Sequence, residues 1–383
     1  MDNISRRFRE LIEHIIFAKL SPSTVRILWL IIVLLLFVST AAIIFDVGGQ
    51  PYNWFPIPVF LACLFFRQRG AYVLIPALGL LLFGLWMRQS DLEDLVLWSA
   101  FEFFKWCVTA LFTIVTVELA MRYRRHELSL ERDIEMARTL QRALIPRNCE
   151  IGRTRITGLM RQCRSVGGDF YYFRPFQEKY IVFCLGDIMG KGIPACMIMS
   201  IVMSFFFEWG KKSPSPATIM SQLNQRLLQL WGSENVWFTT LFYGVFNEEN
   251  GVLTYASGGH DTALLQRKGG EIQLLQTEGL PVGAFEESTW VEVPVQLEGG
   301  DRVILFTDGL TEARDRKGNF IGFDKVMDII RLHAHLGAQE LIDLLEKTVL
   351  EHSQGEVSDD LAILIMEVKE GSVWSPSKNL KAE

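Results

Sequence analysis

Cysteine is scarce in this chain of 383 residues, and it is not arranged for chemistry. There are six cysteines, and no two of them form a C-x-x-C pair. Cys63 and Cys107 lie in membrane-like apolar runs, and Cys184 lies in a shorter apolar run. This placement favours reduced thiols in packed interiors over disulfides or a zinc site.

Positive charge is also scarce. The chain has 38 Lys and Arg against 44 Asp and Glu, a net charge of −6. The deficit lies after residue 121, where 29 basic residues oppose 35 acidic ones, whereas the first 121 residues carry nine of each. An acidic C-terminal part argues against a nucleic-acid partner. No internal repeat is present, and the first apolar run begins too late and lacks the small-residue cleavage site of a signal peptide.

Apolar residues are abundant, at 49% of the chain, and most of the excess precedes residue 122. The apolar runs are residues 26–45, 52–66, 71–87 and 95–120. The first is long enough to cross a bilayer, although the second is short. We predict a membrane domain over residues 26–121 with four transmembrane helices at these runs, preceded by a cytoplasmic tail, residues 1–25.

The basic residues between the runs support this count. They concentrate in the N-terminal tail, in the connection at residues 66–71 and just after residue 121, which all face the cytoplasm if four helices cross. A three-span alternative merges residues 52–87, buries Arg67 and Arg69, and places the C-terminal half outside. Within the last run, Glu102 and Lys105 lie three apart on one helix face and could pair. The pair forms either a ligand-sensing or helix-contact site, or lies near the interface and reaches outward to water, and the second interpretation is favoured.

Residues 122–146 are predicted to form a helix that continues from the last apolar run, because they contain no glycine and end at Pro146. Apolar positions with a 4-3-4-3 spacing, interrupted by one polar residue, are Leu130, Ile134, Ala137, Gln141 and Leu144. This spacing is typical of a coiled-coil seam, through which two copies could form a homodimer and carry a signal from the membrane. An amphipathic helix packed on its own domain is the equal alternative.

The remainder of the chain, residues 147–369, has the pattern of an α+β domain. Strands are predicted at residues 154–162, 180–186, 238–246, 252–257, 262–267, 271–276, 289–297, 302–307 and 361–368. Helices are predicted at residues 193–209, 215–231, 323–334 and 338–353. Because hairpin turns join most of the strands, we expect antiparallel sheets covered by helices. The tail at residues 370–383 is predicted to be disordered.

Short acidic motifs recur where the predicted strands end. They are Gly167-Gly168-Asp169, Gly186-Asp187, Asp308-Gly309 and Asp359-Asp360. Carboxylates at strand ends can converge at one edge of a sheet, where they repel each other unless a cation neutralises them. Hard oxygen ligands in this number suit Mg²⁺ or Mn²⁺.

Two other interpretations of these motifs fail, because the spacing or the residue types do not match. The stretch from Gly186 to Gly192 lacks the spacing and the hydroxyl residue of a phosphate-binding P-loop. Gly167-Gly168-Asp169-Phe170 lacks the acidic residue that the diguanylate cyclase signature requires at the fourth position. His260, between two predicted strands, is interpreted as a structural hydrogen-bonding residue.

Taken in order, the motifs resemble the SpoIIE-like branch of the metal-dependent, type 2C (PPM-type) serine/threonine protein phosphatases. The matching stretches are Ala137-x-x-x-Gln141-x-x-Leu144-Ile145-Pro146, Gly167-Gly168-Asp169-Phe170-Tyr171, Gly186-Asp187-x-x-Gly190-Lys191-Gly192-x-Pro194-Ala195, Phe238-x-Thr240-Leu241, Gly258-Gly259-His260, Gly279-x-Pro281-x-Gly283, Gly300-Asp301, Thr307-Asp308-Gly309-x-x-Glu312-Ala313, Phe320-x-Gly322 and Asp359-Asp360. They cover residues 130–368 and leave out the predicted membrane domain. The resemblance implies two antiparallel β-sheets sandwiched between helix layers.

The resemblance also implies a hydrolase that uses two divalent cations, manganese or magnesium. Asp187 would bridge both ions and hold the metal-bridging water that attacks the phosphoryl group. Asp169 and the backbone carbonyl of Ile188 would bind one ion. Asp308 and Asp359 would bind the other, with Asp360 beside it as a less certain ligand.

Two basic residues, Arg164 and Lys191, are weaker candidates for contact with the substrate phosphate, and for Arg164 an ordinary surface position is favoured. Three positions depart from the family pattern. Met189 stands where the family usually has Ser or His, so no side-chain general acid is evident at this position. Asp261 stands where Asn is common, and Ala362 stands where Thr is common. None of the departures removes a metal ligand, so activity is expected.

The resulting hypothesis is a bacterial inner-membrane, multi-pass protein serine/threonine phosphatase with its catalytic domain in the cytoplasm. Its expected substrate is the phosphoserine or phosphothreonine of a regulatory protein, such as an anti-sigma-factor antagonist, in a signal-transduction pathway. A non-catalytic membrane signalling module on the same fold is the alternative. Transport by the membrane half is a weaker one, because its short spans contain few polar residues.

Overall fold

The computed structural model of the chain describes residues 22–45, 56–66, 72–87, 92–209, 215–231 and 237–372. Contacts divide the chain into two compact units, Met1–Arg132 and Asp133–Glu383. Most of the predicted cytoplasmic tail, the connection that carries Arg67 and Arg69, and most of the predicted disordered tail lie outside the described residues. The side chain of Glu102 also lies outside them, so its predicted pairing with Lys105 is not tested.

The first unit consists of helices at the positions of the four apolar runs. They are α2 (Pro22–Ile44), α3 (Pro56–Phe66), α4 (Leu74–Met87) and the first part of α5 (Leu92–Leu144). Fully buried side chains from three of these helices, Val59, Ala77 and Trp106, pack in one cluster. The sides turned away from the cluster are apolar as well: Leu34, Phe37 and Phe112 are 63%, 60% and 72% exposed.

The lengths of these helices do not support four full spans. Among the described residues, one helical stretch, Phe104–Leu144, is long and apolar enough to cross a membrane by length and composition. Helix α3 has 11 residues and α4 has 14. At about 1.5 Å per residue, each is shorter than a hydrocarbon core of about 30 Å. Helix α3 begins at Pro56, a residue that fits the first turn of a helix but not its interior.

Helix α5 is continuous over its 53 residues and ends at Leu144, shortly before Pro146, as the sequence predicts. The last turns of α5, from Asp133 on, belong to the second unit, and there the end of the predicted seam packs within that unit. Gln141 is 1% exposed, and Leu144 packs against the core, whereas Leu130 is 52% exposed. At this end of the helix, the amphipathic alternative is therefore the correct one.

The second unit contains two antiparallel sheets. The six-stranded sheet has the order β1-β2-β11-β10-β7-β8 and the five-stranded sheet the order β3-β4-β5-β6-β9. The first consists of β1 (Cys149–Ile151), β2 (Thr154–Arg161), β11 (Leu361–Val368), β10 (Arg302–Phe306), β7 (Ala263–Gln266) and β8 (Ile272–Leu275). The second consists of β3 (Phe170–Phe176), β4 (Tyr180–Ile188), β5 (Thr239–Asn247), β6 (Val252–Gly258) and β9 (Val293–Gln296).

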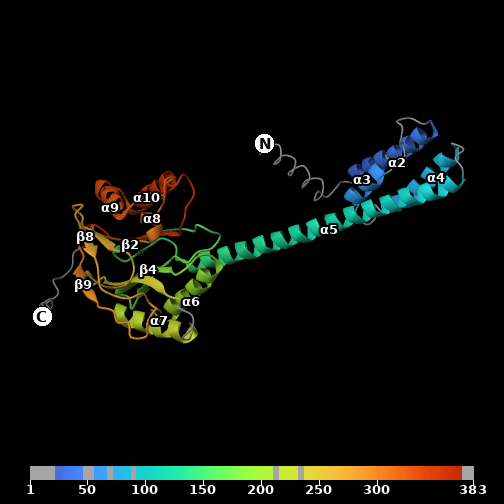
Figure 1. Ribbon diagram of the computed structural model, residues 1–383. Helices are drawn as coiled ribbons and strands as arrows, with labels where there is room; N and C mark the ends of the chain where they lie inside the picture. Colours follow the sequence, from blue (N-terminus) through green and yellow to red (C-terminus); the bar gives the residue numbers. More distant parts are fainter. Residues whose placement is uncertain are drawn as a thin grey trace. The chain divides into compact units, whose positions relative to one another are not determined.

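Helices cover both outer faces of the sheets (Figure 1). Helices α6 (Ile193–Trp209) and α7 (Pro216–Trp231) pack on the five-stranded sheet. Helices α9 (Phe323–Leu332) and α10 (Ala338–His352) pack on the six-stranded sheet. A third cluster, which includes Phe183, Phe242 and Leu364, fills the space between the sheets. The predicted fold of two antiparallel sheets between helix layers is confirmed.

All nine predicted strands are present, but β1 and β3 were not predicted. The seven residues of β3 bury their first four side chains in succession, so no alternation of polar and apolar residues marks them. Its Pro175 is tolerated because β3 is an edge strand. All six cysteines are free, and Cys63, Cys184 and Cys196 are buried.

Candidate metal centre

The two sheets bring the acidic motifs to their ends in pairs. Asp169 directly precedes β3, and Asp187 lies near the end of β4, where Phe170 of β3 pairs with Gly186. Antiparallel pairing therefore places the beginning of one strand beside the end of the other. On the six-stranded sheet, β10 is followed directly by the short helix α8 (Asp308–Thr311), which begins with Asp308.

The second pair follows the same rule. Phe306, at the end of β10, pairs with Ile363 near the start of β11, and Asp359 and Asp360 directly precede β11. The backbone N–H of Thr307 donates to the carbonyl of Ala362 at 3.0 Å. The six-stranded sheet therefore contributes three of the predicted acidic residues.

Buried hydrogen bonds join the two pairs across the sandwich. The hydroxyl of Thr307 donates to Oδ2 of Asp169 at 2.6 Å. The carboxylate of Asp360 accepts the backbone N–H of Cys163 on Oδ1 and that of Gly168 on Oδ2, both at 2.8 Å. Thr307, Asp169 and Asp360 are 1%, 2% and 3% exposed, so water does not compete for these bonds.

Burial and mutual repulsion raise the pKa values of three predicted ligand carboxylates, Asp169, Asp187 and Asp308. Burial raises the pKa of Asp187 to about 7; a hydrogen bond with Asp169 opposes this, and the charges of Asp308, Asp359 and Asp360 add to it. Burial and the charge of Asp187 raise the pKa of Asp169 well above its ordinary value.

Asp308 experiences the same repulsion. Burial raises its pKa to about 6, and the charges of Asp359, Asp261 and Glu312 add to the effect. Lys191 supplies one compensating charge, because its ammonium group lies 2.6 Å from Oδ2 of Asp359 and 3.1 Å from the carbonyl oxygen of Ser358. The cluster is therefore under-compensated and would be stabilised by a cation.

The donor set fits hard divalent cations. It consists of carboxylate oxygens together with the carbonyl of Ile188, which faces Gly168: a Cβ added to Gly168 would lie 2.9 Å from that oxygen. Within the described ranges, no group of three or more His, Cys, Asp and Glu side chains is arranged so that it could hold a metal ion. Carboxylate and carbonyl oxygens are the ligand type that Mg²⁺ and Mn²⁺ prefer, and Mg²⁺ commonly keeps several waters as well.

The loop after Asp187 carries Lys191, and Arg164, from the connection between β2 and β3, lies beside this loop. Gly190 and Gly192 have φ values of +95° and +77°, a conformation that L side chains rarely adopt. The guanidinium of Arg164 lies beside Gly192, with Nη1 3.7 Å from the position that a Cβ there would take. Met189 is 45% exposed in the same loop. Lys191 thus lies next to the acidic cluster through its ion pair with Asp359, and Arg164 lies beside the glycine loop that follows Asp187.

His260 forms a hydrogen bond between neighbouring segments of the five-stranded sheet. Its Nδ1 lies 3.0 Å from the hydroxyl of Thr240, which pairs with Asp187 across β4 and β5. Burial lowers the pKa of His260 to about 4, although the Phe306 backbone partly offsets this, so the ring is neutral at neutral pH. Asp261 and Glu312, which sequence reasoning did not place in the cluster, add negative charge beside Asp308.

Thr307 is the main residue of the site that sequence reasoning missed. Its hydroxyl donates to Asp169 and accepts the backbone N–H of Ala362 at 2.9 Å, so it links β10, β11 and the turn before β3. The signal in the sequence is its position directly before the Asp308-Gly309 turn. A polar residue at the end of an apolar strand is too common to be assigned a partner without the structure.

Replacing Thr307 by Val keeps the shape of the side chain but removes both hydrogen bonds. We expect the free energy of unfolding to fall by about 1–3 kcal/mol, because Asp169 and the Ala362 N–H are left buried without this partner. Urea denaturation measures the effect. Thr348→Val is the matched control, since the Thr348 hydroxyl bonds only to the carbonyl of Leu344 in its own helix. Equal stability of the two variants would contradict the assigned contact.

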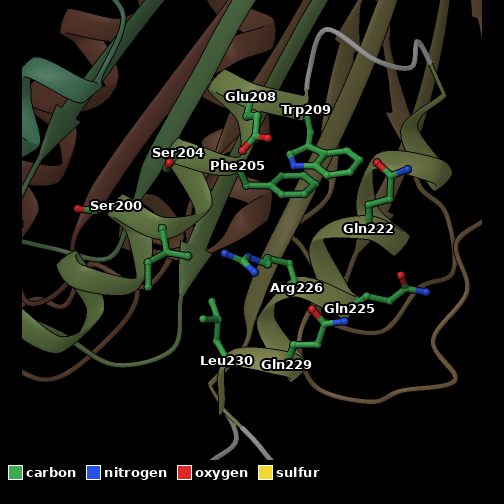
Figure 2. A pocket seen from close by; sticks show the side chains of 11 residues that line it. Ser200, Ser204, Phe205, Glu208, Trp209, Gln222, Gln225, Arg226, Gln229 and Leu230 are labelled. Atoms are coloured by element: carbon green, nitrogen blue, oxygen red, sulfur yellow. The ribbon is translucent and has the colours of Figure 1, made fainter.

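A separate pocket of about 690 Å³ lies between α6 and α7 (Figure 2). Phe205, Glu208 and Trp209 come from α6, and Gln222 and Arg226 come from α7. Its lining includes none of the predicted metal ligands. The acidic cluster, rather than this pocket, is therefore the candidate centre for chemistry.

In a comparison with known protein families, residues 177–369 match the family model of stage II sporulation protein E (SpoIIE). The phosphoserine phosphatase RsbU of Bacillus subtilis is 26% identical over 263 residues, which are 67% of this chain and 77% of that protein. Protein IcfG of Synechocystis is 24% identical over 260 residues, or 61% of this chain, and these span only 41% of that protein.

Two solved structures are similar in fold. The SiaA-PP2C domain of Pseudomonas aeruginosa aligns with a TM-score of 0.56 and 22% identity, covering 63% of this chain and 98% of that domain. The PP2C phosphatase domain of SpoIIE from Bacillus subtilis, solved with a fragment of its regulatory domain, aligns with a TM-score of 0.50 and 19% identity, covering 57% of this chain and 64% of that one.

Proposed function

The chain belongs to the stage II sporulation protein E (SpoIIE) family, and from that premise we propose that it is a membrane-anchored phosphatase for phosphoserine or phosphothreonine in a regulatory protein. The chain is a metal-dependent protein phosphatase, as its relatives RsbU and SpoIIE support. The single observation that carries the finer proposal is the convergence of Asp169, Asp187, Asp308 and Asp359 at the adjoining ends of the two sheets.

Two divalent cations, Mn²⁺ or Mg²⁺, would supply an activated water near neutral pH and offset the charge of the phosphoryl group. Asp187, near the end of β4, would bridge them. Asp169 and the Ile188 carbonyl would bind one ion, and Asp308 and Asp359 would bind the other. Lys191, which is ion-paired with Asp359, and Arg164, which lies beside Gly192, would bind the phosphate oxygens of the substrate.

Asp360 has a different part in this proposal. Both of its oxygens already accept backbone N–H groups, so it holds the turn before Asp169 in place. We therefore assign Asp360 to positioning the site rather than to direct metal binding. Leaving-group protonation has no side-chain donor at Met189 and would fall to solvent.

Membrane anchoring is supported by the surface of the first unit. A water-soluble helical bundle buries its apolar faces and exposes polar ones. Here the helices are apolar on both sides, and exposed residues such as Leu34 and Phe112 belong to different helices. We propose that residues 26–121 anchor the chain in the bacterial inner membrane, with the catalytic domain in the cytoplasm and a membrane or periplasmic cue acting through α5.

Dimerisation through residues 122–146 would use apolar side chains of α5 that the chain itself leaves exposed. Leu130, Met136 and Leu140 are 52%, 66% and 69% exposed on this helix. A second copy of α5 could cover them. Insertion of one to four residues after Glu127 should then change activity with a helical period, and a flat response would contradict coupling through the helix.

The test of catalysis uses the full chain in detergent with a serine-phosphorylated anti-sigma-factor antagonist as substrate. We expect release of phosphate that requires Mn²⁺ or Mg²⁺ and that EDTA abolishes. Separation of cell membranes from cytosol should place the chain in the membrane fraction. The non-catalytic alternative gains support if the metal-loaded protein binds the phosphoprotein but releases no phosphate from it or from a chromogenic phosphate ester.

A further inference from the structure

A buried glutamine in the last turns of α5 contacts the loop that carries Asp169. The Nε2 of Gln141 donates to the carbonyl oxygen of Gly167 at 2.8 Å, and its Oε1 accepts the N–H of Gly167 at 3.2 Å. A third hydrogen bond, at 2.7 Å, comes from the Nε2 of Gln162. Two of the three bonds therefore hold both backbone groups of one residue.

Packing alone does not account for a glutamine at this position. Burying an amide side chain is unfavourable unless its polar atoms find partners. Leu144 and Ile145 already anchor the end of α5 against the hydrophobic core. An apolar residue at position 141 would extend that contact, whereas Gln141 instead uses its polar atoms on the backbone of Gly167.

Gly167 is confined from a second direction. A Cβ added to Gly167 would overlap the carboxylate of Asp360, which in turn accepts the N–H of Gly168. Gly168 itself abuts the Ile188 carbonyl. The loop before Asp169 therefore lies between Gln141 on one side and Asp360 on the other, and a shift of either one moves the backbone that leads into Asp169.

We propose that Gln141 is a positioning residue: it ties the last turns of α5 to the Gly167-Gly168-Asp169 loop, so that the placement of α5 sets the affinity of the acidic cluster for Mn²⁺. This inference deepens the proposed function and rests on it. It identifies the route by which α5 would act on the site. The link is a pair of directional hydrogen bonds to one backbone residue, and a small displacement of the helix would break them.

The test measures Mn²⁺ binding by the full chain in detergent, with the EPR signal of free Mn²⁺ as the readout. Gln141→Met and Gln141→Leu remove the hydrogen bonds with little change in volume. We expect the half-saturating Mn²⁺ concentration to rise about tenfold in both, as the loss of two buried hydrogen bonds suggests. Phosphatase activity at saturating Mn²⁺ should return to within about threefold of wild type, because every ligand remains.

The matched control is Gln162→Met, which removes only the third hydrogen bond and leaves both bonds to Gly167. Its Mn²⁺ affinity is expected to stay within about twofold of wild type. Thermal melting of each metal-free variant separates positioning from packing. Wild-type Mn²⁺ affinity in a folded Gln141 variant overturns the proposal, and so does failure of both Gln141 variants to fold, which would make Gln141 a packing residue.

The outcomes also distinguish this inference from the proposed function. If the wild-type chain binds Mn²⁺ but hydrolyses no phosphate ester, the proposed function fails, and the binding titration still decides the part that Gln141 plays. If the wild-type chain is active and the Gln141 variants match its Mn²⁺ dependence, only the inference about Gln141 fails.

Discussion

Replacement of Asp187 by Asn is expected to lower the Mn²⁺-dependent kcat/KM about a thousandfold or more. Asp187 interacts electrostatically with the other predicted ligands, and Asn offers one neutral oxygen in place of two that share a negative charge. Loss of several kcal/mol of metal-assisted transition-state stabilisation corresponds to this factor. Steady-state hydrolysis of a phosphoserine substrate by the full chain measures the change.

The same variant is expected to keep or gain stability without metal, which separates loss of chemistry from loss of fold. The pKa of Asp187 rises from its ordinary 3.8 to about 7 in the folded protein. A raised carboxylate pKa means that wild-type stability decreases as the pH rises from about 4 to about 7. Asp187→Asn removes the charge that repels the neighbouring carboxylates, so the melting temperature of the variant relative to wild type should be higher at pH 8 than at pH 4.

The surface residue Asp328 provides the control for Asp187. The Asp328 side chain is 65% exposed and forms an ion pair with Arg331. Asp328→Asn therefore removes one carboxylate charge at a residue that is not a predicted ligand. We expect wild-type activity from this variant, since exposed ion pairs contribute little. Comparable activity of the Asp187 and Asp328 variants at saturating Mn²⁺ would remove Asp187 from the catalytic site.

Replacement of Gly309 by Ala should damage both stability and activity. A Cβ on Gly309 would overlap the backbone carbonyl oxygen of Asp360, which cannot move aside as a flexible side chain would. The segments that carry Asp308 and Asp359 must therefore separate. We expect a loss of about 1–3 kcal/mol in the free energy of unfolding, the usual cost of overpacking. A fall in kcat/KM should accompany it, because two ligands are displaced together.

Gly269→Ala is the matched substitution, because the space around a Cβ at Gly269 contains no atom within 4 Å. Urea denaturation and Mn²⁺-dependent hydrolysis are measured on both variants. The Gly269 variant should resemble wild type in both measurements. If Gly309→Ala also resembles wild type, the close approach of α8 to the Asp360 backbone is not the constraint described here.

The helices α6 and α10 show why much of this fold was predictable. Both keep their predicted bounds to within one residue, because the apolar positions recur at helical spacing and turn residues flank them. Strand β3 was not predictable in the same way. Both of its faces are buried at its start, and that burial is a property of the sandwich rather than of the local pattern.

The sequence by itself determined the α+β class, the acidic motifs at strand ends and their order along the chain, because alternation, turn residues and motif spacing are local. Only the tertiary structure decided that Asp360 clamps backbone N–H groups, that Thr307 bonds Asp169, and that Gln141 binds Gly167. Each of these contacts joins residues at least 26 positions apart. Directional hydrogen bonds of this kind depend on how two sheets and the end of α5 pack, and spacing along the chain does not encode them.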